Sequence, residues 1–444
     1  MRLRNTNRLP HLCHLFIGLM LLGWPLQGVE SGAPEALRIN AQRLQERIER
    51  MARIGGSPQG VTRLAFTEAD LSGRAYVTRL MQEAGLEVRV DEAGNLSGRL
   101  PGVLPGLAPI VLGSHIDTVP LAGAYDGVLG VMAAIECVQV LGEVGIPVRH
   151  PLEVIVFANE EGGLTGSRAL AGRINAQALE ESSRSGMSIR AGIAALGGNA
   201  DRISQAIRRP GEVKAYLELH IEQGGSLESE GTDIGIVEGF VGIRWWDVTV
   251  TGFANHAGTT PMNARRDALL AASRLVIAVN RAAKSLPGRQ VATVGRIRAE
   301  PGAPNVIPGR VELSLELRDL AKPKLDRVFR EIRRRAQLIG EETDTEIEFN
   351  EIDIGVEPVL TDPNLQGAIR LMAEALGLSY TRLPSGAAHD AQNMAHMAPS
   401  ALIFVPSVGG ISHSPREYTK PRDVANGANL LLHMLIGLDR QAGP

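Results

Sequence analysis

The fold that we predict for this chain rests on two apolar segments, PIVLG (Pro109–Gly113) and LEVIVFA (Leu152–Ala158). Both have the length of a strand, and a helix is expected between them, from about residue 128 to residue 141. Strands with one solvated face alternate apolar and polar residues, whereas continuous apolar runs are typical of parallel strands covered on both faces. The pattern therefore predicts an α/β domain with a parallel-rich sheet and helices on both faces.

The chain on either side of these segments extends the same pattern. Residues 37–51 carry apolar side chains at alternating spacings of four and three, which predicts an amphipathic helix. Thr67 and Asp70 have the spacing of a capping box, and they open a second helix that Gly85 ends. Short strands are expected over residues 86–90, 95–100 and 401–406.

A different pattern begins near residue 235. The strands expected there alternate apolar and polar residues, so one face of their sheet is solvated or covered by a partner. Their order with two helices, β-α-β-β-α-β, fits a ferredoxin-like unit. The strands are expected over residues 245–252, 291–302, 311–319 and 345–352, and the helices over residues 266–284 and 322–339. We therefore predict a larger domain over residues 34–235 and 351–444, interrupted by a smaller domain over residues 236–350.

The first thirty residues have the layout of a secretory signal. Arg2, Arg4 and Arg8 precede the apolar segment LFIGLMLLG (Leu15–Gly23), which is too short for a comfortable membrane span. We predict a signal peptide over residues 1–30, export to the periplasm or the exterior, and no stable membrane span in the mature chain. The alternative is an uncleaved anchor or a misassigned start codon, and a misassigned start would leave the protein cytoplasmic.

The composition of the 444-residue chain is that of a soluble globular enzyme, with 44% hydrophobic and 21% charged residues. A formal net charge of −3 and an aromatic content of 4% argue against nucleic acid as a partner. Of the two cysteines, Cys13 lies in the signal segment and leaves Cys137 alone. A single thiol forms no intramolecular disulfide.

Metal-ligating side chains fall where strands are expected to end. His115 follows the first apolar run, Glu161 follows the second, and His220 ends the segment YLEL. Asp126 and His413 lie in glycine-rich stretches. Sites in open α/β sheets form beyond the carboxyl ends of the strands. Three imidazoles and two carboxylates without a thiolate suit zinc first, or manganese or cobalt, so we predict two divalent ions.

Each of these residues taken alone also has a structural explanation. A single histidine is more often a packing or surface residue, and Asp-Gly is usually a turn. However, five histidines lie beside glycines, carboxylates or amides in loop-like stretches, and these are His115, His220, His256, His389 and His413. We interpret the whole set as a binuclear metallohydrolase site.

Neighbouring carboxylates suggest how such a site works. Glu160 lies directly beside a ligand and is the candidate general base, the alternative being that it only supports that ligand. Asp117 follows His115 by two residues, where a carboxylate can fix the imidazole tautomer. Asp126 is the candidate bridging carboxylate, because Gly127 lets the backbone fold close to the metals.

Longer motifs resemble the metal-dependent peptidase and amidohydrolase superfamily, and most closely its hydantoinase/carbamoylase group. The resemblance runs from about Leu44 to the end of the chain. It is carried by GSHIDTVP (Gly113–Pro120), LELHIEQG (Leu217–Gly224), FANHAGTTPM (Phe253–Met262), SGAAHDA (Ser385–Ala391) and FVPSVGGISHSPRE (Phe404–Glu417). His220 discriminates within the superfamily, because the peptidase branch usually places a carboxylate at that ligand.

The resemblance implies that residues 34–235 and 351–444 form a catalytic, metal-binding domain and that residues 236–350 form a lid and dimerisation domain. It thus implies a homodimer formed through the lid domain. It also implies substrate binding by Gln223, His256, Asn305 and Arg318. His256 is expected to stabilise the oxyanion from the partner subunit, and Arg318 to bind a carboxylate, which a guanidinium matches bidentately. The alternatives are a surface ion pair of Arg318 with Asp319 and a turn-forming role for Asn305.

The resemblance further implies hydrolysis of the carbamoyl or ureido C–N bond of a small carboxylate-bearing substrate. An N-carbamoyl-L-amino acid is the first choice and would yield amino acid, ammonia and carbon dioxide. Allantoate, ureidoglycolate and β-ureidopropionate are alternatives, followed by aminoacylase or dipeptidase activity. A metal-binding protein without catalysis is a further alternative, which the presence of Glu160 argues against. The loop after Glu161 is shorter than in many relatives, and the role of His389 stays open.

Overall fold

The two apolar segments pair as neighbouring parallel strands in a computed structural model that describes residues 37–352 and 356–441. β5 (Ile110–His115) and β6 (Leu152–Phe157) are buried along their whole length. β5 is also parallel to β7 (Ala215–Ile221), which is parallel to β18 (Ser400–Val405). The predicted signal segment lies outside the described residues. Within those residues, no helix is long and apolar enough to cross a membrane.

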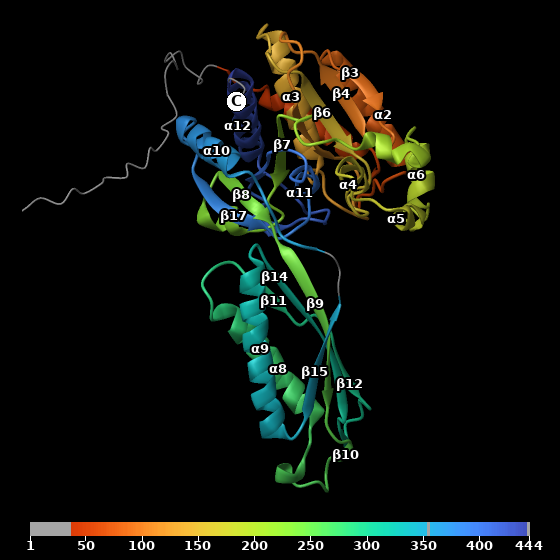
Figure 1. Cartoon of the computed structure of the whole chain (residues 1–444), viewed down its shortest axis with the longest axis vertical. Coiled ribbons are helices and arrows are strands. Elements are labelled where there is room, and N and C mark those ends of the chain that lie inside the picture. Colours follow the sequence, from red (N-terminus) through yellow and green to blue (C-terminus); the bar gives the residue numbers. More distant parts are fainter. Residues whose placement is uncertain (1–36, 353–355, 442–444) are drawn as a thin grey trace, which may run out of the picture. The chain divides into compact units, whose positions relative to one another are not determined.

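Further strands extend this parallel centre into a nine-stranded sheet (Figure 1). The strand order is β16-β8-β18-β7-β5-β6-β4-β3, with β17 beside β8. The pairs β3–β4 and β4–β6 are antiparallel, as are β16–β8 and β18–β8, so antiparallel strands flank the centre. The added strands are β3 (Glu87–Val90), β4 (Leu96–Leu100), β8 (Ile234–Phe240), β16 (Val359–Leu360) and β17 (Tyr380–Ser385).

Helices cover both faces of this sheet, as predicted. Alternate residues of β5 enter different cores, since Leu112 belongs to one apolar cluster and Val111 to the other. The larger cluster contains residues of α1 (Ala41–Arg53), α2 (Glu68–Glu83), α3 (Val128–Glu143), α10 (Pro363–Ala375) and α12 (Pro421–Arg440). The smaller cluster contains residues of α4 (Thr165–Leu170) and α11 (Asp390–Met394). Half of the predicted capping box is present, because the Thr67 side chain accepts the Asp70 N–H, whereas the Asp70 carboxylate accepts the N–H of Phe66 rather than that of Thr67.

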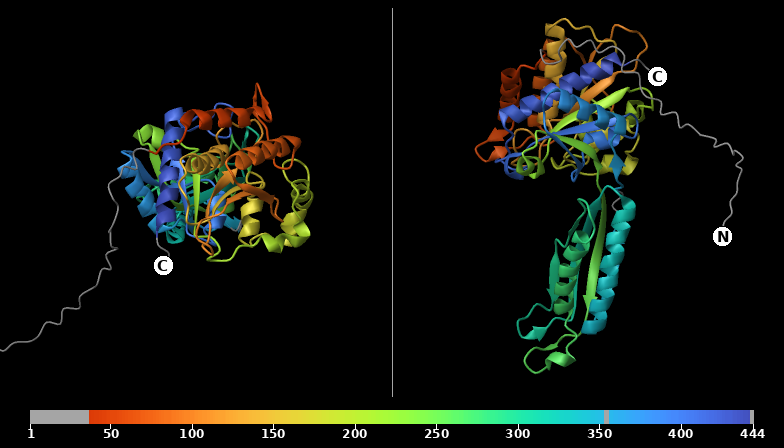
Figure 2. Two further views of the ribbon diagram at one scale, coloured as in Figure 1. Left: turned by 90° about the horizontal axis from the view of Figure 1, so that it is seen from above. Right: turned by 90° about the vertical axis from the view of Figure 1, so that its left-hand side faces the viewer.

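A second, antiparallel sheet follows the predicted β-α-β-β-α-β order, except that the second predicted strand is divided in two. Its strand order is β11-β14-β9-β15, with β12 beside β14. Helices α8 and α9 pack side by side on one face of this sheet, as Figures 1 and 2 both show. The elements are β9 (Gly242–Thr251), α8 (Ala268–Lys284), β11 (Val291–Thr293), β12 (Ile297–Glu300), β14 (Arg310–Asp319), α9 (Lys322–Thr343) and β15 (Glu346–Ile352). The predicted fold class is confirmed.

One predicted strand, over residues 291–302, is wrong in detail because it is divided into β11 and β12. Both pair with β14, but Thr293 lies opposite Glu316 whereas Ile297 lies opposite Leu313, so the register shifts by one residue. The interruption falls around Gly295, where a missing side chain lets the strand bulge. The change between the two sheets falls at Val241, between β8 and β9, and the domain boundaries themselves remain a proposal.

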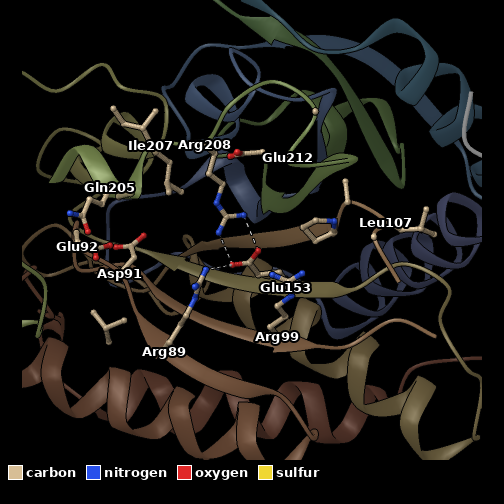
Figure 3. A pocket seen from close by; sticks show the side chains of 17 residues that line it. Arg89, Asp91, Glu92, Arg99, Leu107, Glu153, Gln205, Ile207, Arg208 and Glu212 are labelled. Carbon is tan, nitrogen blue, oxygen red and sulfur yellow. Dashed lines mark hydrogen bonds and ion pairs between the residues drawn. The ribbon is translucent and has the colours of Figure 1, made fainter. Parts of the chain in front are cut away.

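A cavity of about 560 Å³ lies against β3, β4 and β6 (Figure 3). Its central carboxylate, Glu153, accepts two hydrogen bonds from the guanidinium of Arg208, at 2.6 and 2.8 Å. Arg89 reaches the same carboxylate at 3.9 Å. None of the side chains predicted to form the catalytic site lines this cavity, so we place the chemistry elsewhere.

Candidate metal centre

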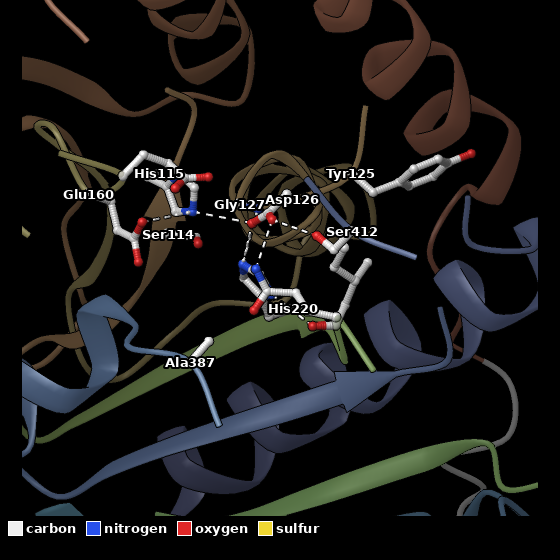
Figure 4. A network of polar contacts seen from close by, with 12 residues as sticks. Ser114, His115, Tyr125, Asp126, Gly127, Glu160, His220, Ala387 and Ser412 are labelled. Carbon is white, nitrogen blue, oxygen red and sulfur yellow. Dashed lines mark hydrogen bonds and ion pairs between the residues drawn. The ribbon is translucent and has the colours of Figure 1, made fainter. Parts of the chain in front are cut away.

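The five predicted metal ligands lie together at the carboxyl ends of the central strands. Figure 4 shows three of them, His115, Asp126 and His220. His115 is the last residue of β5, His220 is the last but one of β7, and Asp126 immediately precedes the Gly127 cap of α3. The ligands form two overlapping groups, and within each group the ligand atoms lie within 4.8 Å of one another. These groups are His115, Asp126 and His220, and Asp126, Glu161 and His413.

Asp126 belongs to both groups. Its Oδ1 lies 3.1 Å from Nε2 of His220 and 3.6 Å from Nε2 of His115. Its Oδ2 lies 3.3 Å from Nε2 of His413, and that nitrogen is also 3.3 Å from Oε1 of Glu161. One carboxylate that presents a different oxygen to each group has the arrangement expected of a bridging ligand.

The imidazole orientations show that the residues fit divalent cations. Nδ1 of His115 lies 2.9 Å from the carbonyl oxygen of Asp117, and Nδ1 of His220 lies 2.8 Å from that of Ile221. A carbonyl oxygen only accepts, so each Nδ1 carries a proton, and Nε2, on the Asp126 side of each ring, is the atom left to bind a cation. Such hydrogen bonds orient histidine ligands in metalloproteins. The two groups therefore suit two cations that share Asp126.

The role expected for the Asp117 side chain is wrong in one respect. The carbonyl of Asp117, rather than its carboxylate, bonds the His115 ring, because the chain turns directly after β5. The carboxylate lies 3.6 Å from that ring. It accepts the backbone N–H groups of Glu160 at 3.2 Å and Glu161 at 3.1 Å. Asp117 therefore fixes the loop that carries the two glutamates.

Unusual backbone conformations bring several of these side chains into place. Gly127 has φ 66°, and a Cβ there would lie 2.4 Å from Nε2 of His115, so the close approach predicted at this glycine is present. Asn159, Gln223 and His413 also lie in the left-handed region, with φ of 54°, 57° and 52°. Non-glycine residues rarely adopt this conformation, and such strain concentrates at functional sites.

The imidazoles and carboxylates strongly perturb one another. Hydrogen bonds to Asp126 and Glu161 raise the pKa of His413 to about 10. Burial opposes ionisation of Asp126, yet its contacts with the three histidines hold its pKa well below the usual range. Burial raises the pKa of Glu160 well above its ordinary value, and His115 partly offsets the rise. Cations that bind here would take the place of protons on the imidazoles.

Comparison with known proteins identifies the family that carries this site. The model of peptidase family M20/M25/M40 matches residues 111–436. The chain belongs to peptidase family M20/M25/M40. M20 enzymes depend on two metal ions, in agreement with the two groups that share Asp126.

Individual M20 relatives match along nearly the whole chain. An N-carbamoyl-L-amino acid amidohydrolase of Geobacillus stearothermophilus is 42% identical, over 89% of this chain and 98% of that protein. An allantoate amidohydrolase of Bacillus subtilis is 37% identical, over 88% of this chain and 96% of that protein. The crystal structure of a hydantoinase/carbamoylase family amidase from Burkholderia multivorans has a TM-score of 0.84 and 37% identity, over 92% of this chain and all of that one. The predicted family and the assignment to the amidohydrolase class of enzymes are confirmed.

Glu417 is a site residue of this M20 enzyme that sequence reasoning missed. Its Oε1 accepts the N–H groups of Tyr125 at 2.8 Å and Asp126 at 3.1 Å, and its Oε2 lies 2.9 Å from the Ser412 hydroxyl. Glu417 is 6% exposed and joins the loop of Asp126 to the loop of His413. Its place at the end of the last motif was the only signal, since its partner Asp126 lies 291 residues away.

Gln223 and His389 line a cavity of about 280 Å³ together with Asp126, Glu160 and His413. Nε2 of Gln223 donates to Oδ2 of Asp126 at 2.8 Å, and its buried Oε1 has no hydrogen-bond partner among the described residues. Both ring nitrogens of His389 also lack partners there, and its ring lies 4.4 Å from that of His220. The structure therefore places His389 in the wall of the site, beside a ligand.

Arg318 lines a second cavity, of about 460 Å³, which adjoins the first because Gln223 and Ala387 line both. Its guanidinium donates to the Glu316 carboxylate at 2.8 and 3.1 Å and to the Gly386 carbonyl at 2.8 Å. The alternative partner Asp319 instead pairs with Lys324, at 2.9 Å. Arg318 is thus held in the wall of this cavity by Glu316, and not by Asp319, the partner that the sequence suggested.

His256 and Asn305 lie together but away from the metal-ligand groups. His256 belongs to β10 (Asn255–His256), which pairs with β13 (Val306–Ile307). The Ala257 N–H donates to the Asn305 carbonyl at 3.0 Å, and His256 and Asn305 are both exposed. Neither residue lines the cavities that contain Glu160 and Arg318. The structure thus divides the predicted site residues into two separate sets.

Proposed function

We propose that this M20 enzyme hydrolyses the carbamoyl or ureido C–N bond of a small substrate that carries a carboxylate. An N-carbamoyl-L-amino acid is the first choice. The observation that carries the proposal is the shared Asp126, with Glu160 and Gln223 in the same cavity and Arg318 in the adjoining one. The names of the relatives at 42% and 37% identity support the reaction class.

Glu160 is the proposed proton carrier. Zn²⁺ ions, or Mn²⁺ or Co²⁺, held by the two ligand groups would polarise the carbamoyl carbonyl and lower the pKa of a water. The Glu160 carboxylate lies 3.6 Å from Nε2 of His115 and lines the cavity, where it can take a proton from that water. The same carboxyl then delivers the proton to the departing nitrogen.

The free Oε1 of Gln223 suits a ureido substrate. A carbamoyl group presents N–H donors, and a buried acceptor without a partner is unfavourable until such a donor arrives. Nε2 of the same amide is occupied by Asp126, which fixes the orientation of the side chain. We therefore assign the carbamoyl N–H groups of the substrate to Gln223.

The remaining donors of Arg318 suit the carboxylate. A guanidinium has five N–H groups. In Arg318, Nε and Nη2 each direct one N–H to Glu316, and Nη1 directs one to Gly386. One N–H of Nη1 and one of Nη2 remain for a bidentate bond to a substrate carboxylate. Glu316 also accepts the indole N–H of Trp245, so the pair is held from both sides.

The second set of site residues supports a two-chain active site. We propose that His256 and Asn305 complete the site of a partner subunit in a homodimer formed through the antiparallel sheet. Their exposure and their separation from the cavities favour this arrangement over a role within the same chain. His256 would then donate to the developing oxyanion.

Ammonia release measures the proposed reaction directly. The assay compares four ureido substrates, namely N-carbamoyl-L-amino acids, allantoate, ureidoglycolate and β-ureidopropionate, with N-acetyl amino acids and dipeptides. Hydrolysis of the last two classes is monitored by the release of a free amine. We expect turnover of at least one ureido compound and none of the amides at comparable rates. Preference for a dipeptide or an N-acetyl amino acid would overturn the proposal in favour of peptidase or aminoacylase activity.

Export is a separate proposal that rests on the first thirty residues. N-terminal sequencing of protein from the cell envelope should begin between about residues 29 and 34 if a signal peptidase acts. An intact Met1 on cytoplasmic protein would contradict it.

A further inference from the structure

Two arginines line the cavity of Arg318, and they differ in how well a carboxylate of the protein compensates their charge. The guanidinium of Arg318 already forms two hydrogen bonds to Glu316, so this pair is neutral before any substrate binds. Glu222, in the same wall, accepts the backbone N–H groups of Ser226 at 2.8 Å and Leu227 at 2.9 Å. A substrate carboxylate that enters therefore adds a negative charge that Arg318 alone does not balance.

Arg289 is the other cation in the wall of this cavity. It lies in the connection between α8 and β11, so it comes from a different part of the small domain than Arg318 on β14. Its single contact with a carboxylate among the described residues is to Glu230, at 3.4 Å. Both side chains of that pair are 42% exposed, and ion pairs between exposed side chains are weak. Most of the donor groups of Arg289 are thus free.

The cavity has room for more than one carboxylate. Its volume is about 460 Å³, and Arg318 and Arg289 both line it. A carboxylate bound to the free edge of Arg318 leaves space for the side chain of the substrate. An acidic side chain would find a guanidinium whose planar fork matches its own geometry.

We propose that Arg289 is a specificity-determining residue that binds a second carboxylate of the substrate. The preferred substrates are then N-carbamoyl derivatives of dicarboxylic amino acids, with one carboxylate on Arg318 and the other on Arg289. This inference rests on the proposed function and narrows its substrate class. The competing occupant is an apolar side chain, which would contact Val241, Val291 and Phe404 in the same cavity.

The test compares matched acidic and neutral substrates. N-carbamoyl-L-glutamate and N-carbamoyl-L-glutamine have nearly the same shape and differ by one charge, and N-carbamoyl-L-methionine represents an apolar side chain. We expect the wild-type kcat/KM for N-carbamoyl-L-glutamate to exceed that for N-carbamoyl-L-glutamine by about tenfold or more, because hydrogen bonds between charged groups are stronger than those to a neutral amide. Arg289→Gln should remove this preference mainly through KM for glutamate and leave the glutamine derivative within about twofold. Arg289→Lys should retain part of it.

Arg296→Gln is the matched control, because Arg296 is an exposed arginine of the same domain that pairs with Asp247 and does not line the cavity. The control should leave the preference unchanged. Equal turnover of glutamate and glutamine derivatives, preference for methionine, or equal damage to all three substrates in Arg289→Gln would overturn the inference. Those results would leave the proposed function intact, whereas failure to hydrolyse any ureido compound would reject the function itself.

Discussion

The proposed site has two parts that differ in burial. One lies at the carboxyl edge of the nine-stranded sheet, and the other lies at the β10–β13 pair. At the sheet edge, Asp126 is 4% exposed and His220 is fully buried, and their orientations are fixed by hydrogen bonds. His256 in the β10–β13 pair and Asn305, the residue before β13, are exposed, and neither belongs to the metal-ligand groups found among the described residues. On the proposed function, one chain would preorganise cation binding, while oxyanion binding by His256 would require the surface of a partner subunit.

Removing the carboxylate of Glu160, the proposed proton carrier, should have the largest effect at the sheet edge. Glu160→Gln should keep its metal content and lose about three orders of magnitude in kcat, since the amide cannot carry the proton. Metal analysis beside steady-state kinetics makes the test. The neighbouring Glu161→Gln is the matched comparison and should lose metal. Metal loss in Glu160→Gln would make Glu160 a ligand and overturn its role.

Loss of the exposed His256 is expected to lower kcat nearly as much, although His256 lies away from the metal ligands. His256→Ala should retain full metal content and lose about a hundredfold in kcat, as loss of one oxyanion donor does. The same kinetics and metal analysis apply. Unchanged activity would show that His256 takes no part in the reaction and would remove the contrast between the two regions.

The substrate clamp should show a smaller effect that depends on the charge of the substrate. Arg318→Lys should raise KM by about tenfold for carboxylate-bearing ureides, because an ammonium group cannot bond both Glu316 and the substrate bidentately. A neutral ureide should be a poor substrate of the wild type and insensitive to the change. Equal damage with both kinds of substrate would exclude Arg318 as the carboxylate anchor.

The smallest effect should come from the buried carboxylate that joins the two ligand loops. Glu417→Gln keeps one oxygen for the Asp126 N–H but weakens the contact with Ser412. Metal affinity, measured by competition with a chelator, should fall by about tenfold, as for other groups that support ligands. Unchanged affinity would mean that the loops hold the ligands without Glu417.

Residues whose roles follow from local spacing were predictable from the sequence. β5 and β6 are continuous apolar runs, so their pairing and the ligands at their ends, such as His115, could be expected. A close approach of the backbone at Gly127 could be expected because glycine has no side chain, and in the structure a Cβ there would have no room beside His115. The division of the small-domain strand at Gly295 could not, because it depends on the register with β14.

Two kinds of contact could not be predicted from the sequence: those that depend on which atom of a residue makes the bond, and those between loops far apart in the chain. The His-x-Asp spacing brought Asp117 to His115, but only the turn after β5 decides that the carbonyl makes the bond. Glu316 holds Arg318 where the adjacent Asp319 was considered, because residues two apart on a strand share a face. The link of Glu417 to Asp126 joins segments that no local pattern connects.

A mixed dimer tests the division between the two regions most directly. Glu160→Gln and His256→Ala homodimers should each be nearly inactive. If His256 serves the partner subunit, a mixed dimer collects both defects in one site and leaves the other intact. Random reassortment makes about half of the dimers mixed, so activity should recover to roughly a quarter of that of the wild type. Efficient subunit exchange without recovery would contradict a site built from two chains.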